Sequence, residues 1–143
     1  MVLRPLGYSV DKIPPRAQLY YVMCVLRACA FLHNKGLCHN DIRSENVVCV
    51  STNIKEWVLI DLEICQPVDT DLPPDLSLNH PLRSVGISTY VGDLNMLPRI
   101  VRSSAFENCE FKNRLGQLIE NHKVRGATDI INAIEEIKVE LED

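Results

Sequence analysis

The feature that most limits the fold of this chain is a cluster of prolines near its middle. Four of the eight prolines fall within residues 66–92, namely Pro67, Pro73, Pro74 and Pro81. Proline has no backbone N–H and a fixed φ, so this density excludes a long helix or a central strand. The sequence therefore predicts an irregular segment over about residues 64–92. A long irregular segment in a compact chain is usually either functional or disordered.

One amphipathic helix is predicted before this segment. Proline is tolerated in a first helical turn, so Pro14 and Pro15 mark its start. Apolar residues then recur at helical spacing, namely at Leu19, Met23, Leu26 and Ala30. Gly36 is expected to end the helix in a left-handed conformation. Residues 1–14 are weakly patterned and are interpreted as an N-terminal segment that precedes a single domain at residues 15–143.

A β-hairpin is predicted between the helix and the proline-rich segment. Residues 47–50 and 57–60 are apolar and rich in β-branched side chains, and a turn-prone stretch of six residues joins them. Polar and charged residues gather at both open ends of this hairpin, at residues 39–46 and 61–63. The hairpin therefore presents two polar stretches to the same side.

Three helices are predicted after the proline-rich segment. Asp93 is expected to cap the first, and Pro98 to kink it or stop it early. The second is marked by Phe111, Leu115 and Leu118. Thr128 or Asp129 is expected to cap the third, whose apolar face comprises Ile130, Ile134, Ile137 and Leu141. The predicted fold class is α+β and predominantly α.

Composition excludes several functional classes. The chain carries 15 Lys and Arg against 19 Asp and Glu, a net charge of −4, which argues against a dedicated nucleic-acid binder. No apolar run approaches the roughly 20 residues that span a bilayer, and the first residues lack the apolar core of a signal peptide. We therefore expect a cytoplasmic or nuclear protein without a membrane partner. The six cysteines form no CxxC pair and match no zinc spacing, so they are expected to be small buried side chains.

The informative motif lies at the open ends of the hairpin. Residues 39–46 read HNDIRSEN, and Asp61-Leu62-Glu63 follows across the hairpin. The first stretch resembles the catalytic loop HRDLxxxN of the protein-kinase-like superfamily, and the second stands where its metal-binding DFG would be. Residues 31–37 and 90–97 are similar to the helix end before that loop and to the large helix after the activation segment. The resemblance covers about residues 15–104.

The resemblance implies a role for each residue at these positions. Asp41 would accept or orient the proton of an acceptor hydroxyl, and Arg43 would contact the transferred phosphate. Asn46 and Asp61 would bind the Mg²⁺ that accompanies ATP, since oxygen ligands suit this cation. The aspartate of the family that braces the backbone of the catalytic loop would be Asp93.

The histidines outside these roles receive a structural interpretation. His39 is expected to be structural rather than a catalytic base. His33, His80 and His122 are expected to be solvated or to cap helices.

The departures from the motif leave several functions open. Asn40 replaces the arginine of HRD, and Leu62-Glu63 replaces Phe-Gly, which is also similar to the choline and aminoglycoside kinase branches. Residues 1–38 contain no glycine-rich phosphate loop, so the expected fold is a kinase C-terminal lobe with the N-lobe absent. The favoured function is an ATP- and Mg²⁺-dependent phosphotransferase, truncated, that acts on a protein hydroxyl. The alternatives are a catalytically inactive kinase-like interaction module, a lobe whose partner supplies the N-lobe, and a fragment of a small-molecule kinase.

Overall fold

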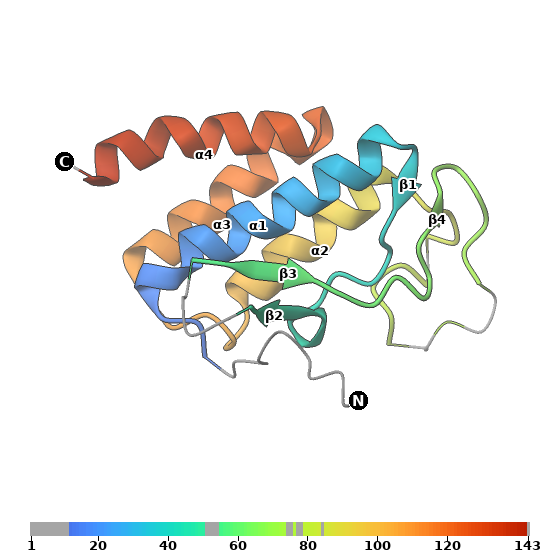
Figure 1. Cartoon of the computed structure of the whole chain (residues 1–143), viewed down its shortest axis with the longest axis horizontal. Coiled ribbons are helices and arrows are strands. Elements are labelled where there is room, and N and C mark those ends of the chain that lie inside the picture. The colour runs from blue at the N-terminus through green and yellow to red at the C-terminus, as the bar shows by residue number, and fades with distance from the viewer. Residues whose placement is uncertain (1–11, 51–54, 74–75, 77–78, 84, 143) are drawn as a thin grey trace.

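The computed structural model describes residues 12–50, 55–73, 76, 79–83 and 85–142. Within them the fold is α+β and mostly helical, as predicted (Figure 1). The helices are α1 (Pro15–Asn34), α2 (Tyr90–Arg102), α3 (Glu110–His122) and α4 (Ala127–Glu142), and the strands are β1 (Leu37–Cys38), β2 (Val47–Cys49), β3 (Trp57–Leu59) and β4 (Gln66–Pro67). Residues 1–11 of the predicted N-terminal segment lie outside the described part.

Helix α1 begins at Pro15, as predicted, and buries a wider face than its apolar stripe indicates. Met23 and Leu26 are buried, whereas Leu19 and Ala30 are only partly covered. The helix contacts α4, α2 and β3, so it is covered from more than one side (Figure 1). The helix ends before Gly36, whose φ of +74° is the left-handed conformation that the sequence predicts.

Three aromatic rings form the centre of the core near the start of α1. The ring of Tyr21 lies 5.0 Å from that of Trp57 and 5.1 Å from that of Phe106, measured between centroids. The residue that leads into α1, Ile13, is 2% exposed, and its N–H donates to the carbonyl of Ala105 at 2.7 Å. The end of the predicted N-terminal segment is therefore held against the loop that follows α2.

Strands β2 and β3 form the predicted hairpin. They are antiparallel, with Val47 opposite Leu59 and Cys49 opposite Trp57. The N–H of Val50 donates to the carbonyl of Glu56 at 3.0 Å and closes the ladder before the connecting loop. Residues 51–54 of that loop lie outside the described part of the chain. The hairpin lies along α1, and its open end holds both polar stretches (Figure 1).

In its described residues the proline-rich segment is irregular up to Thr89, apart from short pairings that the sequence does not reveal, and the last residues of the predicted segment belong to α2. Strand β4 pairs antiparallel with β1, and Asp71 bridges to Ile87. Pro67 is accommodated because it lies at the end of a two-residue strand. Pro74 lies outside the described residues.

The start of α2 corrects one prediction. Asp93 does not cap this helix, because Thr89 is the N-cap residue and its Oγ1 accepts from the N–H of Gly92 at 2.9 Å. Pro98 does not stop the helix, which continues to Arg102. Leu94 on the same helix is fully buried, so packing outweighs the backbone hydrogen bond that proline removes.

The last two helices follow the apolar pattern closely. Leu115 of α3 and Ile130 and Ile134 of α4 are fully buried. Helix α4 begins at Ala127, slightly earlier than the predicted caps Thr128 and Asp129. The side chains of Ile137 and Leu141 lie outside the described part. No helix in the described residues is both long and apolar enough to cross a bilayer.

Candidate functional site

The polar stretch after β1 is held in place by one buried carboxylate on α2. Asp93 is fully buried, and its Oδ2 accepts from the backbone N–H of His39 at 2.8 Å. Its Oδ1 accepts from the N–H of Asn40 at 2.7 Å. His33 Nε2 lies 2.8 Å from Oδ2, and the His33 ring stacks on Tyr90 at 4.4 Å. The carboxylate therefore fixes two consecutive peptide groups directly before Asp41, the bracing role that the resemblance implies for this residue.

The imidazole of His39 joins the two polar stretches. The N–H of Asp41 donates to His39 Nδ1 at 3.1 Å, so Nδ1 carries the lone pair and the hydrogen lies on Nε2. That Nε2–H donates to the carbonyl of Ile60 at 2.8 Å, directly before Asp61. His39 is fully buried. It is structural, as expected, and it sets the spacing between the Asp41 loop and the end of β3.

Asn40 has a backbone conformation that few residues adopt. Its φ is +71°, in the left-handed region that asparagine tolerates better than bulkier residues. Its Nδ2 donates to the carbonyl of Ile64 at 3.0 Å, and its Oδ1 accepts from the hydroxyl of Ser88 at 3.0 Å. Where the kinase motif has an arginine, this chain has a buried amide that ties the loop to the proline-rich segment at two points.

Three of the candidate site residues, Asp41, Arg43 and Asn46, lie together in the structure. The amide Nδ2 of Asn46 donates to the Asp41 carbonyl at 2.8 Å and to Asp41 Oδ2 at 3.1 Å. Arg43 Nε lies 3.5 Å from Asp41 Oδ1 and 3.6 Å from Glu45 Oε2. Both hydrogen bonds of the Asn46 NH₂ group go to Asp41, and no described residue donates to Asn46 Oδ1.

Asp61 lies beside this group but does not contact it through its side chain. The N–H of Ile60 donates to the carbonyl of Asn46 at 2.7 Å, which joins the two backbones at the open end of the hairpin. Asp61 is exposed and has a φ of +63°. Among the described residues, its carboxylate accepts one hydrogen bond, from the N–H of Glu63 at 3.2 Å. The carboxylate is therefore available to a ligand from solvent.

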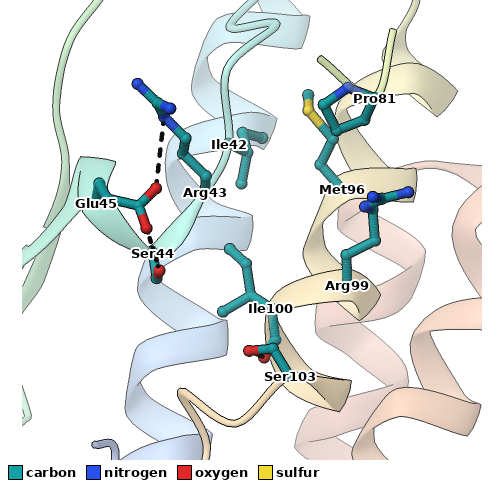
Figure 2. Close-up of a pocket in the computed structure, with 9 residues that line it drawn as sticks. All are labelled: Ile42, Arg43, Ser44, Glu45, Pro81, Met96, Arg99, Ile100 and Ser103. Carbon is teal, nitrogen blue, oxygen red and sulfur yellow. Dashed lines mark hydrogen bonds and ion pairs between the residues drawn. The ribbon is translucent and has the colours of Figure 1, made fainter. Parts of the chain in front are cut away.

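Two adjoining cavities follow the Asp41 loop along α2, and together we call them the loop–α2 groove. One, of about 250 Å³, is lined by Asp41, Arg43 and His80 among others. The other, of about 180 Å³, lies between residues 42–45 and the side of α2 (Figure 2). They share Ile42, Arg43, Pro81 and Met96. The groove is lined by apolar side chains together with charges of both signs, namely Asp41, Glu45, Arg43 and Arg99.

Two sets of side chains place potential cation ligands near one another, and one set suits a cation better than the other. Asn46 Oδ1 and the Asp61 carboxylate are hard oxygen donors, and among the described residues only Asp61 Oδ1 accepts a hydrogen bond, from the Glu63 N–H. His33, Cys38 and Asp93 also place potential ligand atoms within 4.8 Å of one another. However, burial raises the pKa of the Cys38 thiol to about 11, and both oxygens of Asp93 already accept hydrogen bonds. This second set is therefore a structural brace rather than a metal centre.

Two of the three remaining histidines differ from expectation. His33 is not solvated, because it lies against Asp93 with a side chain only 10% exposed. His80 is not solvated either, because its Nε2 is buried 3.4 Å from Asp41 Oδ1. No sequence pattern around either histidine reveals its contact, since the partners are 60 and 39 residues apart in sequence. His122 follows expectation, with Nδ1 against the Leu118 carbonyl near the end of α3.

The arrangement combines a positioned carboxylate, a nearby cation and two uncommitted oxygen donors beside a groove. Such a set can receive a proton, contact an anion and hold a divalent ion. No protein-family model and no curated protein matches the chain. The proposed function therefore rests on the chemistry of this site.

Proposed function

We propose that the chain is an ATP- and Mg²⁺-dependent phosphotransferase of the protein-kinase-like superfamily, in which residues 15–143 form a catalytic C-terminal lobe. The observation that carries this proposal is the brace: Asp93 binds the N–H groups of His39 and Asn40 and thereby directs Asp41 toward Asn46. The positive φ of Asn40 in this loop, and of Asp61 across the hairpin, supports a functional site, because strained backbone conformations cluster at such sites.

Asp41 is the group that handles the proton. Its Oδ2 is held by the Asn46 amide, and its Oδ1 faces the cavity that adjoins Arg43 and His80. A hydroxyl that enters this cavity meets a carboxylate in a fixed orientation, which lowers the entropic cost of transfer. Arg43 lies on the same side, so its guanidinium can contact a phosphate that approaches Asp41.

Asn46 and Asp61 are suited to the cation of a nucleotide. Both offer an oxygen that the described residues do not use, and the Ile60–Asn46 backbone hydrogen bond keeps their chain positions adjacent. When bound, Mg²⁺ with ATP would supply the transferable phosphoryl group and neutralise its charge. The protein contributes two ligands on separate, hydrogen-bonded segments.

A protein hydroxyl is the favoured acceptor. The loop–α2 groove extends beyond Asp41 along one side of α2 as far as Ser103, rather than closing around a single small molecule (Figure 2). This elongated form suits an extended peptide that carries a hydroxyl. Asp41 and Glu45 line the groove together with Arg43 and Arg99, so its charge is mixed and the form of the groove is what favours a peptide over a choline- or aminoglycoside-type acceptor.

A calorimetric titration of the whole chain with ATP, with and without Mg²⁺, tests this function. We expect binding that requires Mg²⁺ and that Asp61→Asn abolishes, while Asp129→Asn, at an exposed position on α4, retains it. A turnover assay on protein mixtures, choline and aminoglycosides then identifies the acceptor class. No binding at millimolar ATP would contradict an autonomous enzyme.

A catalytically inactive interaction module is the second candidate, and an apolar surface favours it. Val58, Ile60 and Leu62 are 44%, 39% and 58% exposed, and they surround Asp61 in sequence. A partner that covers these residues, such as a chain that supplies an N-lobe, would also complete the nucleotide clamp. Retention of Asp41, Asn46 and Asp61 together favours the enzyme.

A further inference from the structure

His80 lies against Asp41 with a donor that nothing in the described structure uses. Its side chain is 9% exposed, and its Nε2 is fully buried. Nε2 lies 3.4 Å from Asp41 Oδ1 but is not aligned for a hydrogen bond with any described residue. Buried donors without an acceptor are rare, so each one needs a physical explanation.

The hydrogen bond at Nδ1 of the His80 ring shows which ring nitrogen carries the hydrogen. The N–H of Leu82 donates to His80 Nδ1 at 3.1 Å, so Nδ1 carries a lone pair. The ring hydrogen of the neutral imidazole is therefore on Nε2, the atom that faces Asp41. Arg43 Nε approaches the same carboxylate oxygen at 3.5 Å, and the Asn46 amide takes the other one.

The turn that carries His80 is anchored on both sides. Leu82 is 3% exposed and belongs to the core. The N–H of Arg83 donates to the His80 carbonyl at 3.1 Å, and the Arg83 guanidinium donates to the carbonyl of Leu76, which is also buried. The imidazole is thus presented to Asp41 by a fixed turn, at the mouth of the 250 Å³ cavity.

We propose that His80 is a positioning residue for Asp41, whose Nε2–H donates to Oδ1 once an acceptor occupies the cavity. Hydrogen bonds of a catalytic group are often long without substrate and tighten when the substrate binds. This inference rests on the proposed function. In the step it serves, the hydroxyl proton passes to Asp41, the hydroxyl oxygen bonds to the γ-phosphorus, and the bond to the β–γ bridging oxygen breaks, so that ADP leaves with the electron pair.

The test compares two substitutions at one position in the whole chain. His80→Leu removes the donor, and His80→Gln retains an N–H at a similar reach. We expect His80→Leu to lower kcat by about 10-fold to 100-fold, the value of one hydrogen bond to a charged group, with little change in Mg²⁺-dependent ATP affinity. His80→Gln should recover most of the loss, and His122→Leu on α3 should leave kcat unchanged. A wild-type kcat in His80→Leu, or a His80→Gln variant no better than His80→Leu, would overturn the assignment.

A measurement without turnover separates this inference from the proposed function. In nuclear magnetic resonance spectra of the ligand-free chain, the His80 Nε2–H signal should shift in Asp41→Asn and stay in place in Asp61→Asn. An unchanged signal in Asp41→Asn would refute the contact with Asp41. If the signal shifts but the wild-type chain binds no ATP, the phosphotransferase function fails while the His80–Asp41 contact stands.

Discussion

At the residue scale, the geometry of the site depends on Asp93 more than on any of the groups assigned to chemistry. Asp41 is partly buried, Arg43 is exposed and Asn46 is 5% exposed, and the backbone that carries them is oriented by a carboxylate with no exposed surface. Burial of such a group is favourable only when its lone pairs are used, and here His33 and two peptide N–H groups use them.

Substitution of this carboxylate by an amide tests that dependence. Asp93→Asn places an NH₂ group where backbone donors need an acceptor, so we expect the free energy of unfolding to fall by about 3 kcal/mol. Asp129→Asn, at an exposed position on α4, should change it by less than about 0.5 kcal/mol. Urea denaturation of both variants measures the difference, and equal stabilities would contradict the brace.

The sequence identifies the candidate site residues but not the distant residues that contact them. Asp41, Asn46 and Asp61 are recognisable because their type and spacing resemble a known motif. The contacts of His33 and His80 leave no such pattern, because each depends on how a distant segment packs. The expectation that these two histidines are solvated or act as caps missed both contacts, because the sequence around a residue says nothing about its long-range contacts.

At the element scale, the first turn of α2 links helix capping to the site. Thr89 accepts from the Gly92 N–H, and Asp93 is the next residue along the helix. A Cβ at Gly92 would lie 2.9 Å from Thr89 Oγ1, closer than such atoms approach. The absence of a side chain at Gly92 is therefore required for the cap, and the cap sets the position of Asp93.

Removal of the Thr89 side-chain cap should destabilise the first turn of α2. Thr89→Ala is expected to lower the free energy of unfolding by about 1 kcal/mol, the usual worth of an N-cap side chain. Thr89→Ser should keep wild-type stability, and Gly92→Ala should lose at least as much as Thr89→Ala because its methyl group displaces the cap. Thermal unfolding distinguishes these variants, and a Thr89→Ala protein as stable as Thr89→Ser would exclude the cap.

Periodicity predicts the long elements of this chain and not the short ones. The four helices and the hairpin each repeat an apolar pattern over several residues, so their existence follows from sequence. The two-residue pairing of β1 with β4 and the bridge from Ile13 to Phe106 are too short to show a period. The prediction that Asp93 caps α2 was wrong for a different reason. An acidic residue near a helix start resembles an N-cap even when its carboxylate is used in a tertiary contact.

At the scale of the whole molecule, free thiols in the core couple stability to alkaline pH. None of the six cysteines forms a disulfide in the described part of the chain, and Cys29 and Cys38 are buried. Burial raises the pKa of Cys38 to about 11 from an ordinary value of 9.0, and it raises the pKa of Cys29 as well. The folded state therefore favours the neutral thiols, whereas the unfolded chain ionises them near pH 9.

This coupling predicts the direction of a pH profile. The stabilisation is fully present below pH 9 and is lost as the pH rises toward 11. Urea denaturation across this range should show declining stability in the wild-type chain and a shallower decline in Cys38→Ala. Cys24→Ala, at a partly exposed position on α1, should decline as the wild type does. A Cys38→Ala profile parallel to that of the wild type would contradict a buried neutral thiol.

The position of Asp93 in the chain also sets the order in which the site can assemble. Its backbone partners precede it by 53 and 54 residues, so the contact closes one of the longer loops of the molecule. The loop around Asp41 can take its final shape only after α2 has docked, because closure of a long loop is unfavourable until packing compensates for it. A nascent chain that has reached Ser88 contains Asp41, Arg43, Asn46 and Asp61 and still lacks the carboxylate that arranges them. The site therefore forms together with the helical core and not before it.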